Sequence, residues 1–360
     1  MHDKSGKNYE KKYNGINLYK LYSIIIPSYN RADEINELLS SLESLDFSNE
    51  KFEIIIADDG STDNTAELVK YFQNKSSYTL KYFSQQNKGP GAARNLGMQN
   101  ASGDFFIFVD SDVTVPPEWL KEIDRALNRE KAEAFGGPDT YLDSFPALLK
   151  AINYSMTSFI TTGGLRGKKG KKLAKFYPRS FNMGLSKKLL EKIGGFGGLR
   201  HGQDIEFSNR IIRSGAKTIF VEKAHVYHKR RTNLRRFWKQ VFNWGMARIN
   251  LYKIDPAMFE LLHAAPAAVT ALTALIALLA IFFPLFLLLF EIGLGLALLV
   301  LLFSMLDSFF IYKQFAPALY LPLVIPIQIF GYGSGFIFNF LRRVVLGKEE
   351  KVGFKKNYYK

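Results

Sequence analysis

The chain has 360 residues, which is long for one domain, so two regions are the better expectation. It contains no cysteine, and this excludes disulfides and thiolate metal sites. The formal net charge is +15 at pH 7, while the C-terminal third is strongly apolar. An anionic membrane surface or a phosphorylated ligand therefore fits the charge better than nucleic acid does.

Alternating strands and helices are predicted after a polar, lysine-rich lead-in over residues 1–20. Short apolar runs predict buried strands, and apolar residues at helical spacing predict the helices between them. Such alternation is typical of an α/β protein with a mostly parallel, doubly wound sheet. The expected elements are strands at 22–27, 52–57, 79–83 and 105–109 and helices at 31–45, 65–72 and 89–100.

Polar clusters follow three of these strands. Each cluster alone is typical of an ordinary turn, but their recurrence at successive strand ends favours one shared cleft, because parallel strands end at one edge of a sheet. Asp110 and Asp112 repel each other unless a cation lies between them, and a hard divalent ion satisfies both. The clusters are Ser28-Tyr29-Asn30, Asp58-Asp59 and Asp110-Ser111-Asp112.

Residues 134–139 predict a further strand end, whose glycines let the backbone approach a ligand closely. A helix is expected at 150–162, followed by a loop at 163–172 that is rich in glycine and cations. These cations either hold a phosphorylated acceptor or lipid headgroups, or they belong to a merely soluble flexible loop. They are Arg166, Lys168, Lys169, Lys171 and Lys172.

The C-terminal third carries a membrane signature. A basic and aromatic helix at 234–252 suits the bilayer interface, and apolar segments at 264–283, 285–311 and 318–340 are long enough to cross. Lysines and arginines crowd both flanks, which places both in the cytoplasm and implies an even number of crossings. The third segment contains prolines and glycines, so it either crosses or forms a re-entrant hairpin. We expect Lys360 to be cytoplasmic and the third segment not to make a simple straight crossing.

Four motifs stand in a specific order and spacing: Pro27-Ser28-Tyr29-Asn30, Asp58-Asp59-Gly60-Ser61-Thr62-Asp63, Asn87-Lys88-Gly89-Pro90-Gly91-Ala92-Ala93-Arg94-Asn95 and Asp110-Ser111-Asp112. Over about residues 21–250 the chain resembles the inverting family-2 glycosyltransferases with the GT-A (Rossmann-like) fold. The resemblance implies that Pro27, Tyr29 and Asp59 line the nucleotide base pocket, Asp59 accepting from a base N–H. It places Arg94 near the nucleotide, where the guanidinium suits anionic oxygens.

The same resemblance assigns the metal and the sugar-transfer chemistry. Asp110 is expected to reach the ribose or a metal-bound water, and Asp112 to bind the metal, Mg²⁺ or Mn²⁺. A histidine some twenty residues past the catalytic base can complete the metal site or touch the diphosphate. His228 fits that position better than His225 does.

Three later stretches resemble the family's acceptor-side loop and catalytic segment: Phe181-Asn182-Met183-Gly184, Gly194-Gly195-Phe196 and His201-Gly202-Gln203-Asp204-Ile205-Glu206. Asn182, Met183 and Gly184 are expected on the acceptor side. The catalytic segment usually reads Glu-Asp after glycine, and here Gln203 replaces the glutamate. Removal of the acceptor proton needs one carboxylate, for which Asp204 is the candidate and Glu206 the fallback, although Asp204 also fits an ordinary helix cap.

The chain is thus predicted to be a membrane-anchored inverting glycosyltransferase with a cytoplasmic catalytic domain at the inner membrane. It would move one sugar from a nucleotide-diphosphate sugar, uridine-linked by resemblance, to a hydroxyl of a lipid-linked acceptor in glycan or cell-envelope polysaccharide synthesis. A nucleotidyltransferase-like enzyme and a non-enzymatic membrane scaffold are the alternatives. The expected regions are a lead-in (1–20), a catalytic domain (21–232), an interfacial helix (233–262), transmembrane segments (263–341) and a basic tail (342–360).

Overall fold

The computed structural model describes residues 18–162, 176–199, 201–229 and 233–350. Its centre is a seven-stranded sheet in the order β3-β2-β1-β4-β8-β6-β9. All neighbouring strands are parallel except β8, which is antiparallel to both β4 and β6. The strands are β1 (Tyr22–Ser28), β2 (Phe52–Asp58), β3 (Thr79–Ser84), β4 (Phe105–Phe108), β6 (Ala134–Gly136), β8 (Met183–Ser186) and β9 (Thr218–Phe220).

Helices cover both faces of this sheet. Ile24 and Ile26 of β1 pack on one face with the helices that include Leu38 and Trp119, whereas Ile25 packs on the other face with those that include Phe207. This alternation, with every residue of β1 buried, explains why the strand has three consecutive isoleucines rather than an apolar residue at every second position. The helices are α2 (Ala32–Leu42), α3 (Thr65–Lys75), α4 (Pro90–Gln99), α5 (Trp119–Glu130), α8 (Lys187–Ile193) and α9 (Gln203–Arg213).

The mostly parallel doubly wound sheet is confirmed, but β8 changes one expectation. Met183 and Gly184, which were expected in an acceptor-side loop, lie instead in this buried antiparallel strand. A side chain on Gly184 would come within 2.6 Å of the Phe106 carbonyl and 2.7 Å of the Phe105 and Phe135 rings. The glycine is therefore explained by close packing between neighbouring strands.

A second, three-stranded sheet joins segments that are far apart in the sequence. It consists of β5 (Val113–Thr114), β10 (Val226–His228) and β7 (Asp139–Thr140), in the order β5-β10-β7. His228 pairs with Val113, and Val226 pairs with Asp139. This register brings residues from three parts of the chain to one point beside the end of β4.

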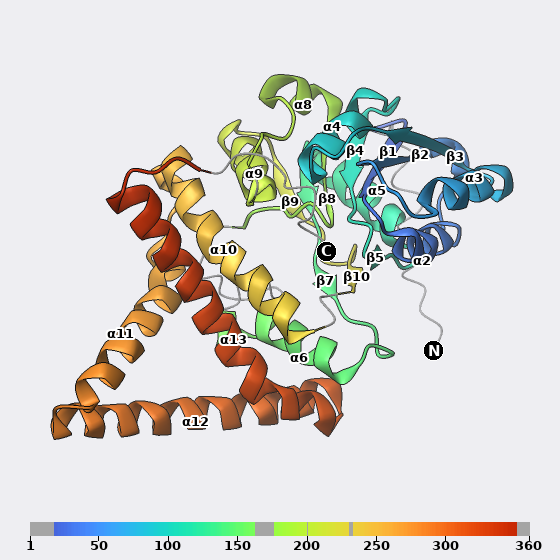
Figure 1. Ribbon diagram of the computed structural model, residues 1–360. Coiled ribbons are helices and arrows are strands. Elements are labelled where there is room, and N and C mark those ends of the chain that lie inside the picture. Colours follow the sequence, from blue (N-terminus) through green and yellow to red (C-terminus); the bar gives the residue numbers. More distant parts are fainter. Residues whose placement is uncertain (1–17, 163–175, 200, 230–232, 351–360) are drawn as a thin grey trace.

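The C-terminal region is helical, and its helices lie beside the α/β part (Figure 1). Helices α10 and α13 run side by side, and α11, α12 and α13 outline an open triangle whose base, α12, lies away from the sheet. Two shorter helices, α6 and α7, precede β8 in the chain. The bounds are α6 (Ala147–Thr157), α7 (Phe159–Thr162), α10 (Leu234–Ile254), α11 (Ala265–Ala280), α12 (Pro284–Tyr312) and α13 (Phe315–Phe340), followed by a π-helical turn at Leu341–Val345.

Helix α6 comes from the middle of the segment expected to be catalytic, yet it packs on the apolar helices. Tyr154 donates to Asp307 of α12 at 2.8 Å, and Asn153 donates to the Tyr312 hydroxyl at 3.0 Å. The buried Lys150 donates to Gln314 at 2.9 Å. These contacts fix the apolar helices to the α/β part.

Among the described residues, three helices are long and apolar enough to cross a membrane: 261–280, 284–312 and 315–345. Of the two alternatives for the third segment, the re-entrant hairpin is wrong, because α13 is one continuous helix that contains Pro322 and Pro326. How this helix lies in a membrane stays a prediction. Its glycines serve close packing instead. A side chain on Gly335 would lie 1.9 Å from the Phe242 carbonyl, and one on Gly245 would lie 2.0 Å from the Tyr332 carbonyl. Small residues on both α10 and α13 thus let the two backbones touch.

Candidate active site

The first two strand-end loops are tied to each other at the carboxyl edge of the sheet. Asn30 accepts a hydrogen bond from the Thr62 backbone at 2.7 Å, and its own backbone N–H donates to Ser61 at 2.8 Å. Asn30 adopts φ +51°, a left-handed conformation that asparagine tolerates. Tyr29 is half-buried beside it, and Pro27 lies within the buried strand β1. The loops expected to surround a base are therefore adjacent.

Asp59 is almost fully buried and organises the entry to α4. Its Oδ1 accepts from Gln85 Nε2 at 2.7 Å and from the Lys88 N–H at 2.9 Å, and its Oδ2 accepts from the Gly89 N–H at 2.7 Å. Because a carboxylate oxygen has two acceptor positions, Oδ2 can accept one further bond. The predicted contact with a base N–H would use that position.

Arg94 and Asp110, both predicted near the nucleotide, are in direct contact. The Arg94 Nη2 lies 2.5 Å from Asp110 Oδ1, and the guanidinium lies over the Phe196 ring at 5.4 Å. The Arg94 side chain is only 6% exposed, and within the described part of the chain its buried Nε has no hydrogen-bond partner. A cation held so firmly beside an acidic strand end can meet an anionic ligand without reorganisation.

The third cluster brings Asp112, His228 and Asp139 together. The Nε2 of His228 lies 3.3 Å from Asp112 Oδ1, and its Nδ1 lies 3.3 Å from Asp139 Oδ2. Burial alone would lower the pKa of His228, but the two carboxylates raise it to about 9. His225 instead makes an edge-to-face contact with Tyr227. Of the two histidines, His228 is thus the one beside Asp112.

Asp139 was not predicted as a site residue. Its only sequence signal is its place after the glycines that follow a strand, which was interpreted as a close backbone approach to a ligand. The pairing of β7 with β10 is a long-range contact, and it alone brings Asp139 to His228. Among the residues that the structure describes, no group of three or more histidines, aspartates or glutamates has the arrangement of a metal site.

The candidate base Asp204 lies in the first turn of α9, after Gly202 in the left-handed conformation. Arg179 Nη1 approaches its Oδ2 at 3.2 Å, and the Asp204 side chain is 27% exposed. Burial raises the pKa of Asp204, but the arginines Arg179 and Arg94, together with the Ile205 N–H, lower it overall. Asp204 is therefore an ionised, partly accessible carboxylate, and Arg94 links it electrostatically to Asp110.

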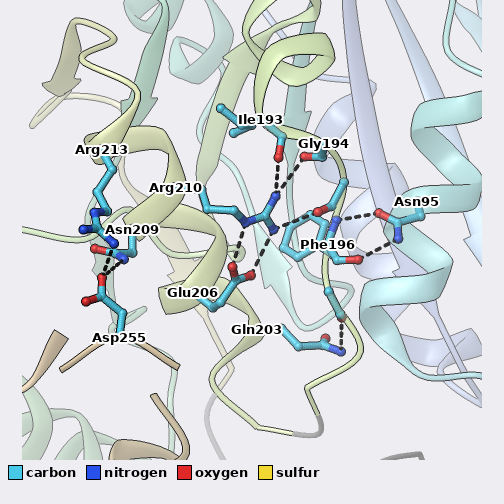
Figure 2. A network of polar contacts seen from close by, with 12 residues as sticks. Asn95, Ile193, Gly194, Phe196, Gln203, Glu206, Asn209, Arg210, Arg213 and Asp255 are labelled. Atoms are coloured by element: carbon cyan, nitrogen blue, oxygen red, sulfur yellow. Dashed lines mark hydrogen bonds and ion pairs between the residues drawn. The ribbon is translucent and has the colours of Figure 1, made fainter. Parts of the chain in front are cut away.

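Glu206, the fallback base, is occupied in a structural network (Figure 2). Arg210 grips it through Nε at 2.7 Å and Nη2 at 2.9 Å, and the same guanidinium donates to the carbonyls of Ile193, Gly194 and Gly195. Glu206 thereby holds the glycine-rich loop that carries Phe196. This arrangement favours Asp204 as the residue available for chemistry.

Gln203, which stands where glutamate is usual, joins α9 to α4. Its Nε2 donates to the Gly197 carbonyl at 3.3 Å (Figure 2), and a side chain on Gly91 would lie 2.6 Å from its Oε1. A side chain at position 91 would therefore require the end of the Gln203 side chain to move. The catalytic segment is thereby seated against the start of the helix that carries Arg94.

The residues expected on the acceptor side are buried. Asn182 accepts from Trp119 Nε1 at 3.1 Å and donates to the carbonyls of Ala224 at 2.7 Å and Pro138 at 3.2 Å. Met183 is fully buried in β8. Within the structure these residues support the sheet beneath the site, and a direct acceptor contact remains a prediction. The cations expected at 166–172 lie outside the described residues.

Comparison with known proteins identifies the α/β part. Residues 23–194 match the family model described as Glycosyl transferase family 2. Poly(ribitol-phosphate) beta-N-acetylglucosaminyltransferase TarS of Staphylococcus aureus is 40% identical over 101 residues, which is 28% of this chain and only 18% of that protein. Glycosyltransferase AglE of Haloferax volcanii is 25% identical over 236 residues, which is 65% of this chain and 74% of that protein.

A solved structure supports the same assignment. The mannosyltransferase PcManGT from Pyrobaculum calidifontis, in complex with GDP-Man and Mn²⁺, aligns with a TM-score of 0.60 at 19% identity, over 85% of this chain and 87% of that one. At this identity the likeness shows the fold. Residues 23–194 therefore form a domain that matches glycosyltransferase family 2, and the chain has the GT-A fold.

Proposed function

We propose that the chain is a metal-dependent, inverting glycosyltransferase of the inner membrane. In this proposal it transfers one sugar from a nucleotide-diphosphate sugar to a hydroxyl of a lipid-linked acceptor, in glycan or cell-envelope polysaccharide synthesis. The observation that carries the proposal lies beside the end of β4. Arg94 contacts Asp110 there and acts electrostatically on Asp204. The proposed donor site and an ionised, partly exposed carboxylate are thereby adjacent, as direct transfer between two substrates requires.

The donor is proposed to bind at the carboxyl edge of the sheet. Pro27 and Tyr29 border the base, Asp59 accepts from a base N–H, and Arg94 and Asp110 lie toward the ribose and phosphates. A uridine nucleotide is favoured by the sequence motifs, whereas PcManGT was solved with GDP-Man. A panel that contains both nucleotides decides between them.

A divalent cation fits beside Asp112. Two ligands that are neighbours around a Mg²⁺ ion at about 2.1 Å lie roughly 3 Å apart. The 3.3 Å between Asp112 Oδ1 and His228 Nε2 is close to that spacing, and Asp139 fixes the imidazole from the other side, as second carboxylates commonly do. Asp112 and His228 would hold the ion once the imidazole Nε2 has lost its proton, with Asp110 contributing through a water. When bound, the cation offsets the charge that builds on the leaving diphosphate.

Asp204 is proposed to act on the acceptor. Its carboxylate takes the hydroxyl proton as the acceptor oxygen forms its bond to the anomeric carbon, while the bond from that carbon to the diphosphate oxygen breaks. A single displacement from the opposite face inverts the anomeric configuration. Arg179 orients the carboxylate, and Gln203 and Glu206 hold the loops on either side.

The membrane location rests on the three apolar helices and their charged flanks. The third helix, α13, packs on α10 close to α9, so an acceptor with an apolar tail would reach Asp204 from the bilayer. The clustering of arginine and lysine before 264 and after 340 favours a cytoplasmic catalytic domain. The positions beyond 350, including Lys360, lie outside the described residues.

A donor panel tests the proposal. The full chain is purified in nanodiscs and incubated with UDP- and GDP-sugars, Mn²⁺ or Mg²⁺, and a bacterial lipid extract. We expect acceptor-dependent release of nucleoside diphosphate with one donor, lost on chelation and in Asp204→Asn but retained in Asp46→Asn, a carboxylate on the surface. Release of sugar 1-phosphate, with the nucleotidyl group transferred to the acceptor, would indicate a nucleotidyltransferase instead, and binding without turnover of any donor would indicate a scaffold.

A further inference from the structure

Arg248 lies where the catalytic segment meets the membrane helices. On α10, Ala247 and Leu251 face the start of α9, since a side chain on Gly202 would lie 3.4 Å and 3.3 Å from them. Gly245 faces α13, against the Tyr332 carbonyl. On a helix with 3.6 residues per turn, position 248 falls between these two contact faces. Arg248 is therefore inserted between α9 and α13.

The guanidinium of Arg248 is incompletely hydrogen-bonded within the described chain. Within the described chain its Nη1 is buried and makes no hydrogen bond. Its electrostatic neighbours are Asp204, Arg179 and the Tyr332 hydroxyl. Within the described residues Arg248 and Arg179 thus share the Asp204 carboxylate, and burial disfavours the charge of Arg248. Buried charges are normally paired, so such an arrangement calls for an anionic ligand.

The other nearby acids are already engaged. Asp255 pairs with Arg213 at 2.7 Å and accepts from Asn209 at 3.0 Å (Figure 2). The Glu260 side chain closes a capping box with the backbone of His263. Asp255 is therefore already paired with a guanidinium, and Glu260 is not among the groups that act most strongly on Arg248.

We propose that Arg248, Arg179 and the Tyr332 hydroxyl form a binding site for a phosphate group of the acceptor. This inference rests on the proposed function and narrows it. The phosphate lies at the boundary between the catalytic segment and the apolar helices, and the hydroxyl to be glycosylated lies at Asp204. Guanidinium groups match phosphate oxygens in geometry and charge. Because α10 and α13 border the site, the phosphate is carried by a lipid rather than by a water-soluble molecule.

Binding of dodecyl phosphate to the full chain in nanodiscs tests the site without an identified acceptor. We expect Arg248→Gln to weaken binding at least tenfold and Tyr332→Phe to weaken it several-fold. Arg125→Gln removes an exposed guanidinium from α5, paired with Glu122 at 3.0 Å, and should change binding by less than twofold. Inorganic phosphate should bind at least tenfold more weakly than dodecyl phosphate.

Nucleotide binding separates this proposal from the proposed function and from misfolding. Arg248→Gln should bind UDP or GDP with Mn²⁺ as the unmodified chain does. Unchanged dodecyl phosphate affinity in Arg248→Gln would overturn the site, and so would a parallel loss of nucleotide binding, which would assign Arg248 to the donor site or to folding. Equal affinities for inorganic and dodecyl phosphate would refute the lipid component. If phosphate binding behaves as expected but no sugar is transferred, the site stands and the proposed function fails.

Discussion

Replacing Asp59 by asparagine keeps the shape of the side chain and changes only its hydrogen bonding. Oδ1 can still accept from Gln85 and Lys88, but an amide nitrogen then faces the Gly89 N–H, which lies 2.7 Å from Oδ2. Two donors thus meet in a buried place. Loss of one charge-assisted hydrogen bond together with an unsatisfied donor costs about 3 kcal/mol or more.

The consequence should appear in stability and in donor binding together. For a domain of this size, about 3 kcal/mol lowers the apparent Tm by roughly 6–12 °C. The segment from Gln85 to Gly89 leads into α4, so a shift there also displaces Arg94 and weakens binding of UDP or GDP. Thermal unfolding in detergent and nucleotide titration of the same samples measure both effects.

Asp46→Asn is the matched control, because Asp46 is an exposed carboxylate, 59% accessible, that pairs with Lys121. It should change neither the Tm nor nucleotide affinity appreciably. If Asp59→Asn unfolds at the temperature of the unmodified chain, the three hydrogen bonds contribute little to the fold, and the reasoning is wrong. If stability falls but nucleotide binding is retained, Asp59 is structural and does not serve the base.

Four further outcomes are expected. Asp112→Asn should abolish transfer and weaken metal-dependent binding of the nucleoside diphosphate, and unchanged metal dependence would refute its role as a ligand. Asp204→Asn should lower turnover by roughly 10²–10⁴-fold with donor affinity within a few-fold; collapse of donor binding would assign it to the donor instead. Gly335→Ala should lower the Tm, since its Cβ would lie 1.9 Å from the Phe242 carbonyl, whereas Gly293→Ala, with nothing within 4 Å, should not; equal melting would contradict the close packing of α10 and α13. A cysteine at Lys360, in a chain with no native cysteine, should resist a membrane-impermeant thiol reagent added to intact cells, because the charged flanks imply an even number of crossings although three helices are long enough; labelling would mean three crossings and would show that the charge argument fails here.

The order of strands and helices was predictable because the burial of an element is visible in the pattern of its own residues. A strand covered on both faces, such as Tyr22–Ser28, must be a nearly continuous apolar run, and that pattern is visible without a structure. The three acidic or polar strand ends were likewise predictable as one edge, since parallel strands end together. The contact between Arg94 and Asp110 follows from two segments each placed at that edge.

The remaining parts of the site depend on pairings between distant segments. Asp139 meets His228 only through the register of a three-stranded sheet, and Arg248 comes within electrostatic range of Asp204 only because α10 packs on α9. Neither contact has a local sequence pattern, because each residue taken alone fits an ordinary surface position. The same reason explains the buried strand β8, whose antiparallel neighbours are far away in the chain.

The third apolar segment shows most clearly which properties the sequence determined and which only the tertiary structure decided. Composition determined that residues 318–340 are membrane-like, and it equally allowed a hairpin, because proline and glycine break helices in isolation. Tertiary packing decided for a continuous helix. Neighbouring helices contact the backbone at Gly335 and Gly245, and a side chain there would be excluded by contacts under 3 Å. Gly335 is thus explained by the close contact of α13 with α10, and no sequence pattern shows that α10 is the neighbour of α13.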